Sequence, residues 1–214
     1  MKLAILGAGN VGGALGKGWA GTGHSIAYGV PSPGNPKYEQ TARNAGGARV
    51  TDVADAVKDA DAIILATPWD AVPAALAASG DFAGRLLIDA TNPLRFGASG
   101  LELAIGFDTC GGEIVAGLAK GAAVVKTMNQ VGFAVMAGFK NYAAPPVMFA
   151  AGDDENAKNL ALQLVAELGF DGRDAGPLKI ARLLEPLAML WIDQVMQHGA
   201  PGDNAFAFLS LQSQ

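Results

Sequence analysis

Residues 3–12 read Leu3-Ala4-Ile5-Leu6-Gly7-Ala8-Gly9-Asn10-Val11-Gly12. Four apolar residues, typical of a buried strand, lead into glycines spaced as G-x-G-x-x-G at the mouth of an expected helix. In this pattern Gly7 permits a tight turn, Gly9 lets the backbone approach a pyrophosphate, and Gly12 allows the helix to pack closely on the strand. Free N–H groups at the helix start, where Asn10 and Val11 lie, favour the anion. The stretch therefore predicts the first unit of a Rossmann fold with a dinucleotide site.

Strand-like apolar runs recur along the rest of the chain, separated by segments of helical length. They are Ser25–Tyr28, Ala62–Ala66, Leu86–Asp89, Ala122–Lys126, Val147–Ala151 and Phe170–Ala175. Such alternation is typical of βαβ units and a parallel sheet. We expect an α/β protein of the Rossmann type, with a doubly wound, mostly parallel sheet and a small C-terminal helical extension. Residues 1–150 would form the NAD(P)-binding domain, and residues 151–214 a smaller C-terminal part that completes the sheet.

Acidic residues are placed to begin two of the helices. Asp52 precedes the segment Val53–Lys58, and either Asp153 or Asp154 precedes a segment that ends at Leu168. A carboxylate in this position accepts hydrogen bonds from the free N–H groups of the first helical turn. The acidic cluster at residues 153–155 therefore suits helix capping better than a divalent metal, and we expect no metal site.

The segment Leu178–His198 carries apolar residues at spacings of three and four, which predicts a strongly apolar helix. Pro186 lies inside this pattern and predicts a kink or a break into two helices. So much apolar surface suggests packing over the active face of the sheet or a subunit interface, with ordinary core packing as the alternative. We expect a homodimer that forms through this helix.

The composition limits the classes of partner and compartment. Half of the 214 residues are hydrophobic and the net charge is -5, which repels phosphate backbones and argues against nucleic acid. The apolar runs are shorter than the roughly 20 residues that a membrane span needs, so no membrane association is expected. Cys110 is the only cysteine, which excludes an internal disulfide and favours a reducing compartment. We expect a cytoplasmic protein.

The loop after the second strand bears on the choice of dinucleotide. An NAD site usually has Asp or Glu here to accept a hydrogen bond from the ribose 2′-hydroxyl, whereas this chain has Tyr28-Gly29-Val30-Pro31-Ser32. Without a carboxylate, a 2′-phosphate meets no like-charge repulsion, which favours NADP. The side chains nearest in sequence that suit the phosphate are Ser32 and Lys37, with Arg43 further on; each is also an ordinary solvated loop residue.

Loops that follow other strands are expected to complete the site, because ligands of such sheets bind beyond the carboxyl ends of the strands. Thr67 and Pro68 would line the nucleotide groove, and Trp69 either flanks a ring or packs at a helix start. Asn92, which precedes Pro93, is a hydrogen-bonding candidate near the nicotinamide or a simple turn residue.

Asn129 is a second such candidate, or the cap of the helix that follows it. The only two histidines, His24 and His198, suit structural or surface roles. Hydride transfer between stacked rings needs no obligatory protein acid or base, since the cofactors carry the electronic work. A redox reaction on a small molecule is therefore compatible with so sparse a set of titratable groups.

Five motifs follow one another along the chain: the glycine loop, Thr67-Pro68-Trp69-Asp70, Asn129, Gly152-Asp153-Asp154 and Asp174-Ala175-Gly176-Pro177-Leu178. In this order the chain resembles the NADP oxidoreductase, coenzyme F-420 (F420)-dependent family. That family passes hydride between NADP(H) and a deazaflavin, and it is similar to the reductase domain of metalloreductases, which passes NADPH electrons to flavin. The resemblance covers nearly the whole chain.

The resemblance implies an NADP-dependent oxidoreductase whose small-molecule acceptor is coenzyme F-420, FAD or FMN. It implies that Asn129 is the catalytic residue beside the nicotinamide, and that Met128 and the run Gly176-Pro177-Leu178 shape an acceptor pocket completed by the C-terminal part. Two positions depart from the family pattern. Pro31 stands where members typically carry an arginine for the 2′-phosphate, and Gln130 stands where they have a threonine.

Two other functions share the glycine loop. A dehydrogenase of the 3-hydroxyacid type needs a long helical second domain with a catalytic lysine, and only about forty residues follow Ala175. The other is a dinucleotide-binding sensor or regulator, which would bind NADPH saturably without turnover.

Overall fold

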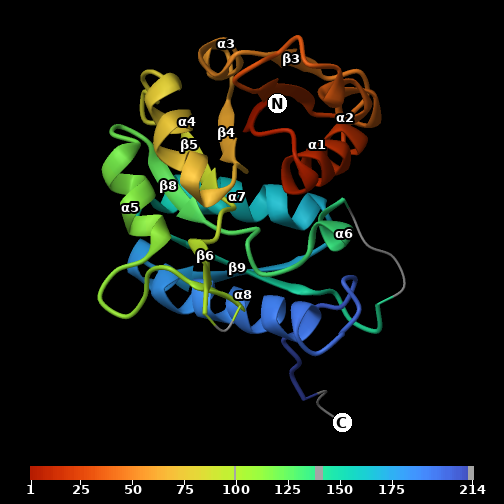
Figure 1. The fold of residues 1–214 in the computed structure, drawn as a ribbon, viewed down its shortest axis with the longest axis vertical. Helices are drawn as coiled ribbons and strands as arrows, with labels where there is room; N and C mark the ends of the chain where they lie inside the picture. The colour runs from red at the N-terminus through yellow and green to blue at the C-terminus, as the bar shows by residue number, and fades with distance from the viewer. Residues whose placement is uncertain (99, 138–141, 212–214) are drawn as a thin grey trace.

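The computed structural model describes residues 1–98, 100–137 and 142–211. An eight-stranded sheet with the order β10-β9-β8-β5-β4-β1-β2-β3 runs through the molecule (Figure 1). Its strands are β1 (Lys2–Leu6), β2 (Ser25–Gly29), β3 (Arg49–Thr51), β4 (Ala62–Leu65), β5 (Leu86–Asp89), β8 (Ala123–Lys126), β9 (Val147–Gly152) and β10 (Asp171–Gly176). All neighbours are parallel except β8 and β9.

Strands β3-β2-β1-β4-β5-β8 have the order of a dinucleotide-binding Rossmann sheet, with β9 and β10 added at one edge. The expected fold class is therefore confirmed. The expected boundary at residue 150 falls within β9, and the division of the chain into two parts stays a prediction.

Helices cover both faces of the sheet. They are α1 (Asn10–Gly21), α2 (Glu39–Asn44), α3 (Val53–Lys58), α4 (Val72–Ala78), α5 (Gly111–Leu118), α6 (Phe133–Met136), α7 (Glu155–Glu167) and α8 (Ala181–Met196), with 3-10 turns η1 (Pro36–Tyr38), η2 (Trp69–Ala71) and η3 (Leu178–Ile180). One buried cluster joins the sheet to α1, α6 and α7, and a second joins it to α3, α4 and α5. None of the helices in the described ranges is long and apolar enough to cross a membrane.

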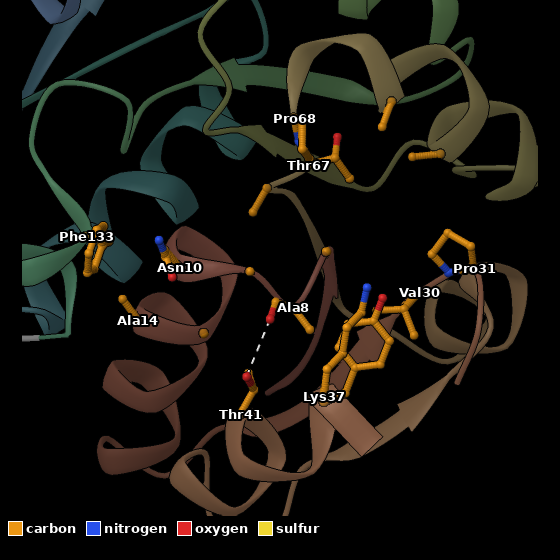
Figure 2. Close-up of a pocket in the computed structure, with 18 of the residues that line it drawn as sticks. Ala8, Asn10, Ala14, Val30, Pro31, Lys37, Thr41, Thr67, Pro68 and Phe133 are labelled. Atoms are coloured by element: carbon orange, nitrogen blue, oxygen red, sulfur yellow. Dashed lines mark hydrogen bonds between the residues drawn. The ribbon is translucent and has the colours of Figure 1, made fainter. Parts of the chain in front are cut away.

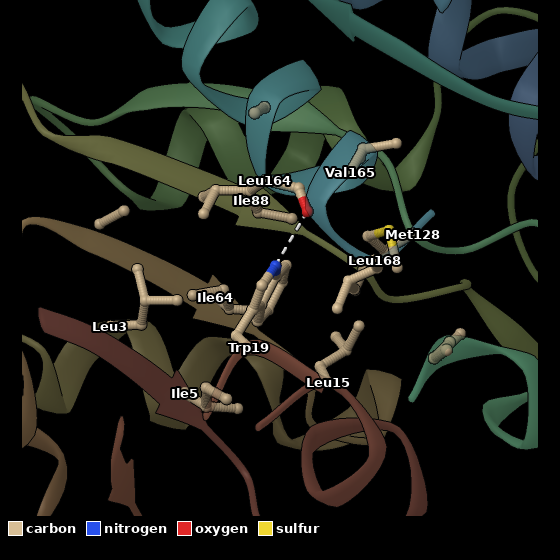
Figure 3. Close-up of a cluster of buried hydrophobic side chains, with 14 of the residues drawn as sticks. Leu3, Ile5, Leu15, Trp19, Ile64, Ile88, Met128, Leu164, Val165 and Leu168 are labelled. Atoms are coloured by element: carbon tan, nitrogen blue, oxygen red, sulfur yellow. Dashed lines mark hydrogen bonds between the residues drawn. The ribbon is translucent and has the colours of Figure 1, made fainter. Parts of the chain in front are cut away.

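Trp19 anchors the first of these clusters. Its ring is fully buried, and its indole N–H donates to the carbonyl of Leu164 at 2.9 Å, so that α1 is bonded to α7 across the face of the sheet (Figure 3). A buried indole with its polar atom satisfied combines a large apolar contact with a fixed orientation. This contact holds the helix whose N-terminus carries the glycine loop.

The helix caps largely agree with the sequence predictions. Asp52 accepts from the backbone N–H of Asp55 at 2.9 Å, and Asp154 accepts from that of Ala157 at 2.8 Å. Asp153 instead accepts from the N–H of Leu178 at 2.9 Å, which ties the loop after β9 to η3. The predicted break at Pro186 is wrong, since α8 runs through that residue without interruption.

The sequence patterns did not predict β3, α2, α6 or a separate antiparallel hairpin. The hairpin consists of β6 (Leu94–Gly97) and β7 (Gly100–Leu103), which pair across a short turn. It packs against α8, which lies beyond β9 at the end of the molecule away from α1–α3 (Figure 1). Arg182 of α8 also forms a bidentate ion pair with Glu113 of α5, in which both N···O distances are 2.7 Å. This ion pair lowers the pKa of Glu113 to about 2.

Candidate functional site

A cavity of about 1020 Å³ lies beyond the carboxyl ends of β1, β2 and β4. This is the switch point of the sheet, from which connections leave to opposite faces, and where ligands of such folds bind. Figure 2 shows Asn10 and Phe133 at one end of the cavity and Pro31 and Lys37 at the other. Its lining includes five of the predicted cofactor residues besides Asn10: Gly7, Gly9, Lys37, Thr67 and Pro68.

The three glycines of the loop serve different purposes. Gly7 has a φ of +105°, and a Cβ there would lie 2.6 Å from the carbonyl oxygen of Ala66. A Cβ on Gly12 would lie 2.1 Å from the carbonyl oxygen of Gly7, so that α1 and the turn can approach only without it. A Cβ on Gly9, by contrast, would meet no protein atom within 4 Å. Gly7 and Gly12 are thus needed for the fold, whereas the space above Gly9 is open to a ligand.

The start of α1 has the features of an anion-binding site. Gly9 precedes the helix, no side chain caps it, and the first turn contains no acidic residue. The N–H groups there are the usual ligands of a pyrophosphate, aided by the helix dipole. Thr67 lies beside this region (Figure 2), with its methyl group rather than its hydroxyl towards Gly7. The hydroxyl itself is buried without a hydrogen-bond partner in the described structure.

The far end of the cavity suits the adenosine part of a dinucleotide. Small apolar side chains of α4 and its approach line one wall: Ala71, Ala74, Ala75 and Ala78. Lys37, whose ammonium lies 4.8 Å from the centre of the Tyr38 ring, also lines this cavity, and Lys17 adds a second cation to the lining. No carboxylate is found among the described lining residues, so the cavity is basic in a protein of net charge -5. Ser32, the other predicted phosphate ligand, is not among these lining residues.

A second cavity of about 640 Å³ adjoins the first. The two share six lining residues: Gly9, Asn10, Ala66, Thr67, Pro68 and Phe133. The second also reaches Val11, Trp69, Asn92 and Asn129, which were all predicted as site residues. A ligand that extends from the first cavity past Thr67 would therefore end at the mouth of the second.

Asn92 and Asn129 are bonded to each other. The Asn92 amide donates to the Asn129 carbonyl at 3.0 Å, and the Asn129 amide donates to the side-chain oxygen of Asn92, also at 3.0 Å. The side-chain oxygen of Asn129 accepts in turn from Gln130, whose carboxamide also bonds both backbone groups of Phe149. Gln130, the departure from the family pattern, thus fixes the orientation of Asn129 and links it to β9.

The remaining predicted residues lie apart from these cavities. Among the described residues, neither cavity is lined by Pro93, Met128, Gly176, Pro177 or Leu178. Pro93 and Met128 are buried, and Leu178 packs in the second core cluster. Gly176 has a φ of +102°, a backbone conformation that favours glycine, and the chain turns there into η3. The Gly176-Pro177-Leu178 run therefore serves the backbone turn and the core in this structure.

The second cavity is completed by residues that were not predicted as site residues from the sequence. They are Arg95, Phe96 and Leu101 of the hairpin, and Trp191 and Ile192 of α8. The alternation of apolar and charged residues on either side of Gly97 and Gly100 was a usable hairpin signal. Cys110 lies outside both linings, and burial raises the pKa of its thiol to about 12.

A buried ionic cluster contacts the loop that carries Asn92. The ammonium of Lys126 is 3.0 Å from Asp89 and 3.0 Å from Glu185, and it donates to the carbonyl of Thr91 at 2.6 Å. All three charged side chains are at most 1% exposed. Burial alone would lower the pKa of Lys126, but the two carboxylates outweigh it and raise that pKa.

The two carboxylates connect this cluster to several secondary-structure elements. Glu185 accepts from the N–H groups of Gly111 and Gly112 at 2.9 and 3.0 Å, at the start of α5. Asp89 accepts from both the N–H and the hydroxyl of Thr91, at 3.0 and 2.6 Å. The cluster thereby joins β5, β8, α5 and α8, and it fixes the loop that carries Asn92.

Residues 2–93 match the model of the family described as NADP oxidoreductase coenzyme F420-dependent. The predicted family resemblance is confirmed. The matched segment contains the glycine loop, Thr67 and Asn92, and ends before the strands and helices that complete the second cavity. Because members of this family are NADP oxidoreductases, the expected enzyme class is confirmed as well. No curated protein matches the sequence.

Two solved structures resemble the whole chain. One is a candidate F420-dependent NADP reductase from Arthrobacter sp. FB24, with 28% identity, a TM-score of 0.86, and coverage of 94% of this chain and 96% of that one. The other is a hypothetical protein from Sinorhizobium meliloti, with 29% identity, a TM-score of 0.72, and coverage of 86% and 90%.

A reductive aminase from Aspergillus terreus in complex with NADPH and ethyl levulinate shares the fold, with a TM-score of 0.67 at 18% identity. The alignment covers 92% of this chain but only 62% of the aminase. At this identity the likeness concerns the fold alone.

We predict that Lys126→Met lowers the free energy of unfolding by about 3–5 kcal/mol, because it leaves two buried carboxylates without their cation. The unpaired carboxylates would take up protons, so the loss should grow as the pH rises from about 5 to 8. Urea denaturation at several pH values measures this. Lys158→Met is the matched control, because Lys158 is 3% exposed but its partners Glu155 and Asp174 are 73% and 46% exposed. Equal losses in the two variants, independent of pH, would contradict the prediction.

Proposed function

We propose that the protein transfers hydride between NADP(H) and a flavin or deazaflavin ring. The observation that carries this proposal is the pair of adjoining cavities, one basic and shaped for a dinucleotide, the other apolar and joined to it at Thr67. Two rings that exchange hydride must stack at about 3–3.5 Å, which needs two sites with a common boundary. A sensor that only binds a dinucleotide would have no use for the second cavity.

The residues of the first cavity would hold the cofactor. The N–H groups at the start of α1 would bind the pyrophosphate above Gly9, and the alanines of α4 would contact the adenine. Lys37 would face the 2′-phosphate, and Thr67 would lie beside the part of the cofactor nearest the second cavity. When bound, the nicotinamide supplies the hydride chemistry, and the protein contributes position and exclusion of water.

Asn129 and Asn92 would position the reacting end. Both side chains line the second cavity, and their mutual hydrogen bonds keep them from rotating. No protein acid or base is required of them, because hydride passes directly between the rings. Their role in this proposal is to hold the ring edges at the boundary between the cavities.

The proposal extends to assembly and compartment. Leu183, Leu190 and Met196 of α8 are 65%, 52% and 63% exposed, an unusual density of large apolar side chains on one helix. We propose that this helix forms a homodimer and that the enzyme works in the cytoplasm.

The direct test is to mix the protein with NADPH and riboflavin or FMN under anaerobic conditions and to follow NADPH absorbance. The proposal expects oxidation of NADPH with bleaching of the flavin. Saturable NADPH binding without oxidation in the presence of either flavin would favour the sensor instead.

We predict that Gly9→Val weakens NADPH binding at least about tenfold while leaving the fold intact. A Cβ at this position would meet no protein atom within 4 Å, and the valine would fill the space over the helix start. Calorimetric titration with NADPH measures the affinity, and circular dichroism checks the fold. Gly106→Val is the control, since that glycine is equally open but lies outside both cavities. A folded Gly9→Val protein with unchanged affinity would refute the assignment of the glycine loop.

We predict that NADPH binds more tightly than NADH, and that Lys37→Ala reduces this difference about tenfold by weakening NADPH alone. The dissociation constants of both cofactors, measured at one salt concentration, decide this. Arg43→Ala should leave the preference unchanged, because Arg43 is engaged with Glu39 and lies outside the cavity lining. A preference that survives Lys37→Ala, or that is absent from the native protein, would count against Lys37 as the phosphate ligand.

A further inference from the structure

The walls of the second cavity are mainly aromatic and aliphatic. Trp69, Phe96, Phe133 and Trp191 come from four separate parts of the chain and converge on it. Tryptophan and phenylalanine faces recognise flat conjugated rings by stacking, with energies that depend little on the substituents of the ring. The shape and chemistry of the lining thus favour a planar acceptor.

The charge of this cavity differs from that of the first. Asp70 and Arg95 are the only charged residues among its described lining. The guanidinium of Arg95 is already bonded, at 2.8 Å, to its cross-strand partner Glu102. An anionic group would therefore meet one carboxylate and one cation that is already paired with a carboxylate, whereas the first cavity presents Lys17 and Lys37 with no described carboxylate.

The polar side chains of the cavity are also largely engaged. Asn92 and Asn129 bond each other, and the hydroxyl of Thr91 donates to Asp89. Few donors are left for a phosphate or carboxylate, which needs several to compensate for the loss of its hydration. Recognition in this cavity therefore rests on ring faces more than on charge.

We propose that the second cavity selects an uncharged planar two-electron acceptor and disfavours one with an anionic group close to the ring. The inference rests on the proposed hydride transfer and specifies its acceptor. In that reaction the acceptor gains a hydride from C4 of the nicotinamide and a proton from water. NADPH is thereby oxidised to NADP⁺, and the acceptor is reduced to its dihydro form.

Riboflavin and FMN provide a matched pair of probes, because they share one ring and differ by a phosphate that carries about -1.5 to -2 charges. Binding is measured by the quenching of flavin fluorescence, without NADPH, and reduction is measured separately with NADPH. We expect riboflavin to bind about fivefold more tightly than FMN. Trp69→Leu should weaken both flavins, which would locate the binding in this cavity.

Glu102→Gln tests the charge argument directly, since it releases Arg95 and should narrow the difference between the flavins. The matched control is Glu39→Gln, which makes the same change of charge and releases Arg43 on α2, away from the second cavity. That control should leave the difference unchanged.

Tighter or equal binding of FMN by the native protein would overturn the inference and leave the proposed hydride transfer intact. Flavin affinity that is insensitive to Trp69→Leu, or a difference that Glu102→Gln leaves unchanged, would overturn it too. Failure of both flavins to bind and to be reduced would instead contradict the proposed function itself.

Discussion

The arrangement of the candidate site depends on the buried contact of Lys126 with Asp89 and Glu185. Ion pairs of this kind are costly to bury, and they persist only where every charge is matched by good geometry. Here the matching partners come from two strands of the sheet and from α8, and Glu185 also closes the start of α5. The helix that supplies Trp191 to the second cavity is therefore fixed to the Rossmann sheet by charge as well as by apolar packing.

The glycine loop and the region beyond Thr67 have different roles in the proposed function. The glycine loop provides a turn, an open space above Gly9 and an uncapped helix start, which together suit a pyrophosphate but imply no particular reaction. The chemistry would depend on what lies beyond Thr67, where the Asn92–Asn129 pair and four aromatic rings surround a cavity of different character. In the proposed function, a basic cavity beside a nearly uncharged one would hold the cofactor and the acceptor in a fixed order.

The sequence predicted the fold well because the signals were local. Short apolar runs marked seven of the eight sheet strands, and the glycine spacing marked the switch point. The second cavity could be predicted less fully, because it is formed by contacts between distant segments. The Gly176-Pro177-Leu178 run, assigned to the acceptor pocket by resemblance, lies apart from both cavities, while Trp191 follows it by 13 residues on α8 and lines the second one. Periodicity identified Trp191 as apolar, but periodicity cannot tell which cavity an apolar side chain faces.

The proposed hydride transfer requires that the nicotinamide lie at the boundary between the two cavities. A crystal structure of the protein with NADP⁺ tests this most directly. We expect the pyrophosphate at the start of α1, the 2′-phosphate within reach of Lys37, and the nicotinamide between Thr67 and Asn129 with one face open to the second cavity. A nicotinamide that turns away from Asn129, or a second cavity filled by the cofactor itself, would contradict it.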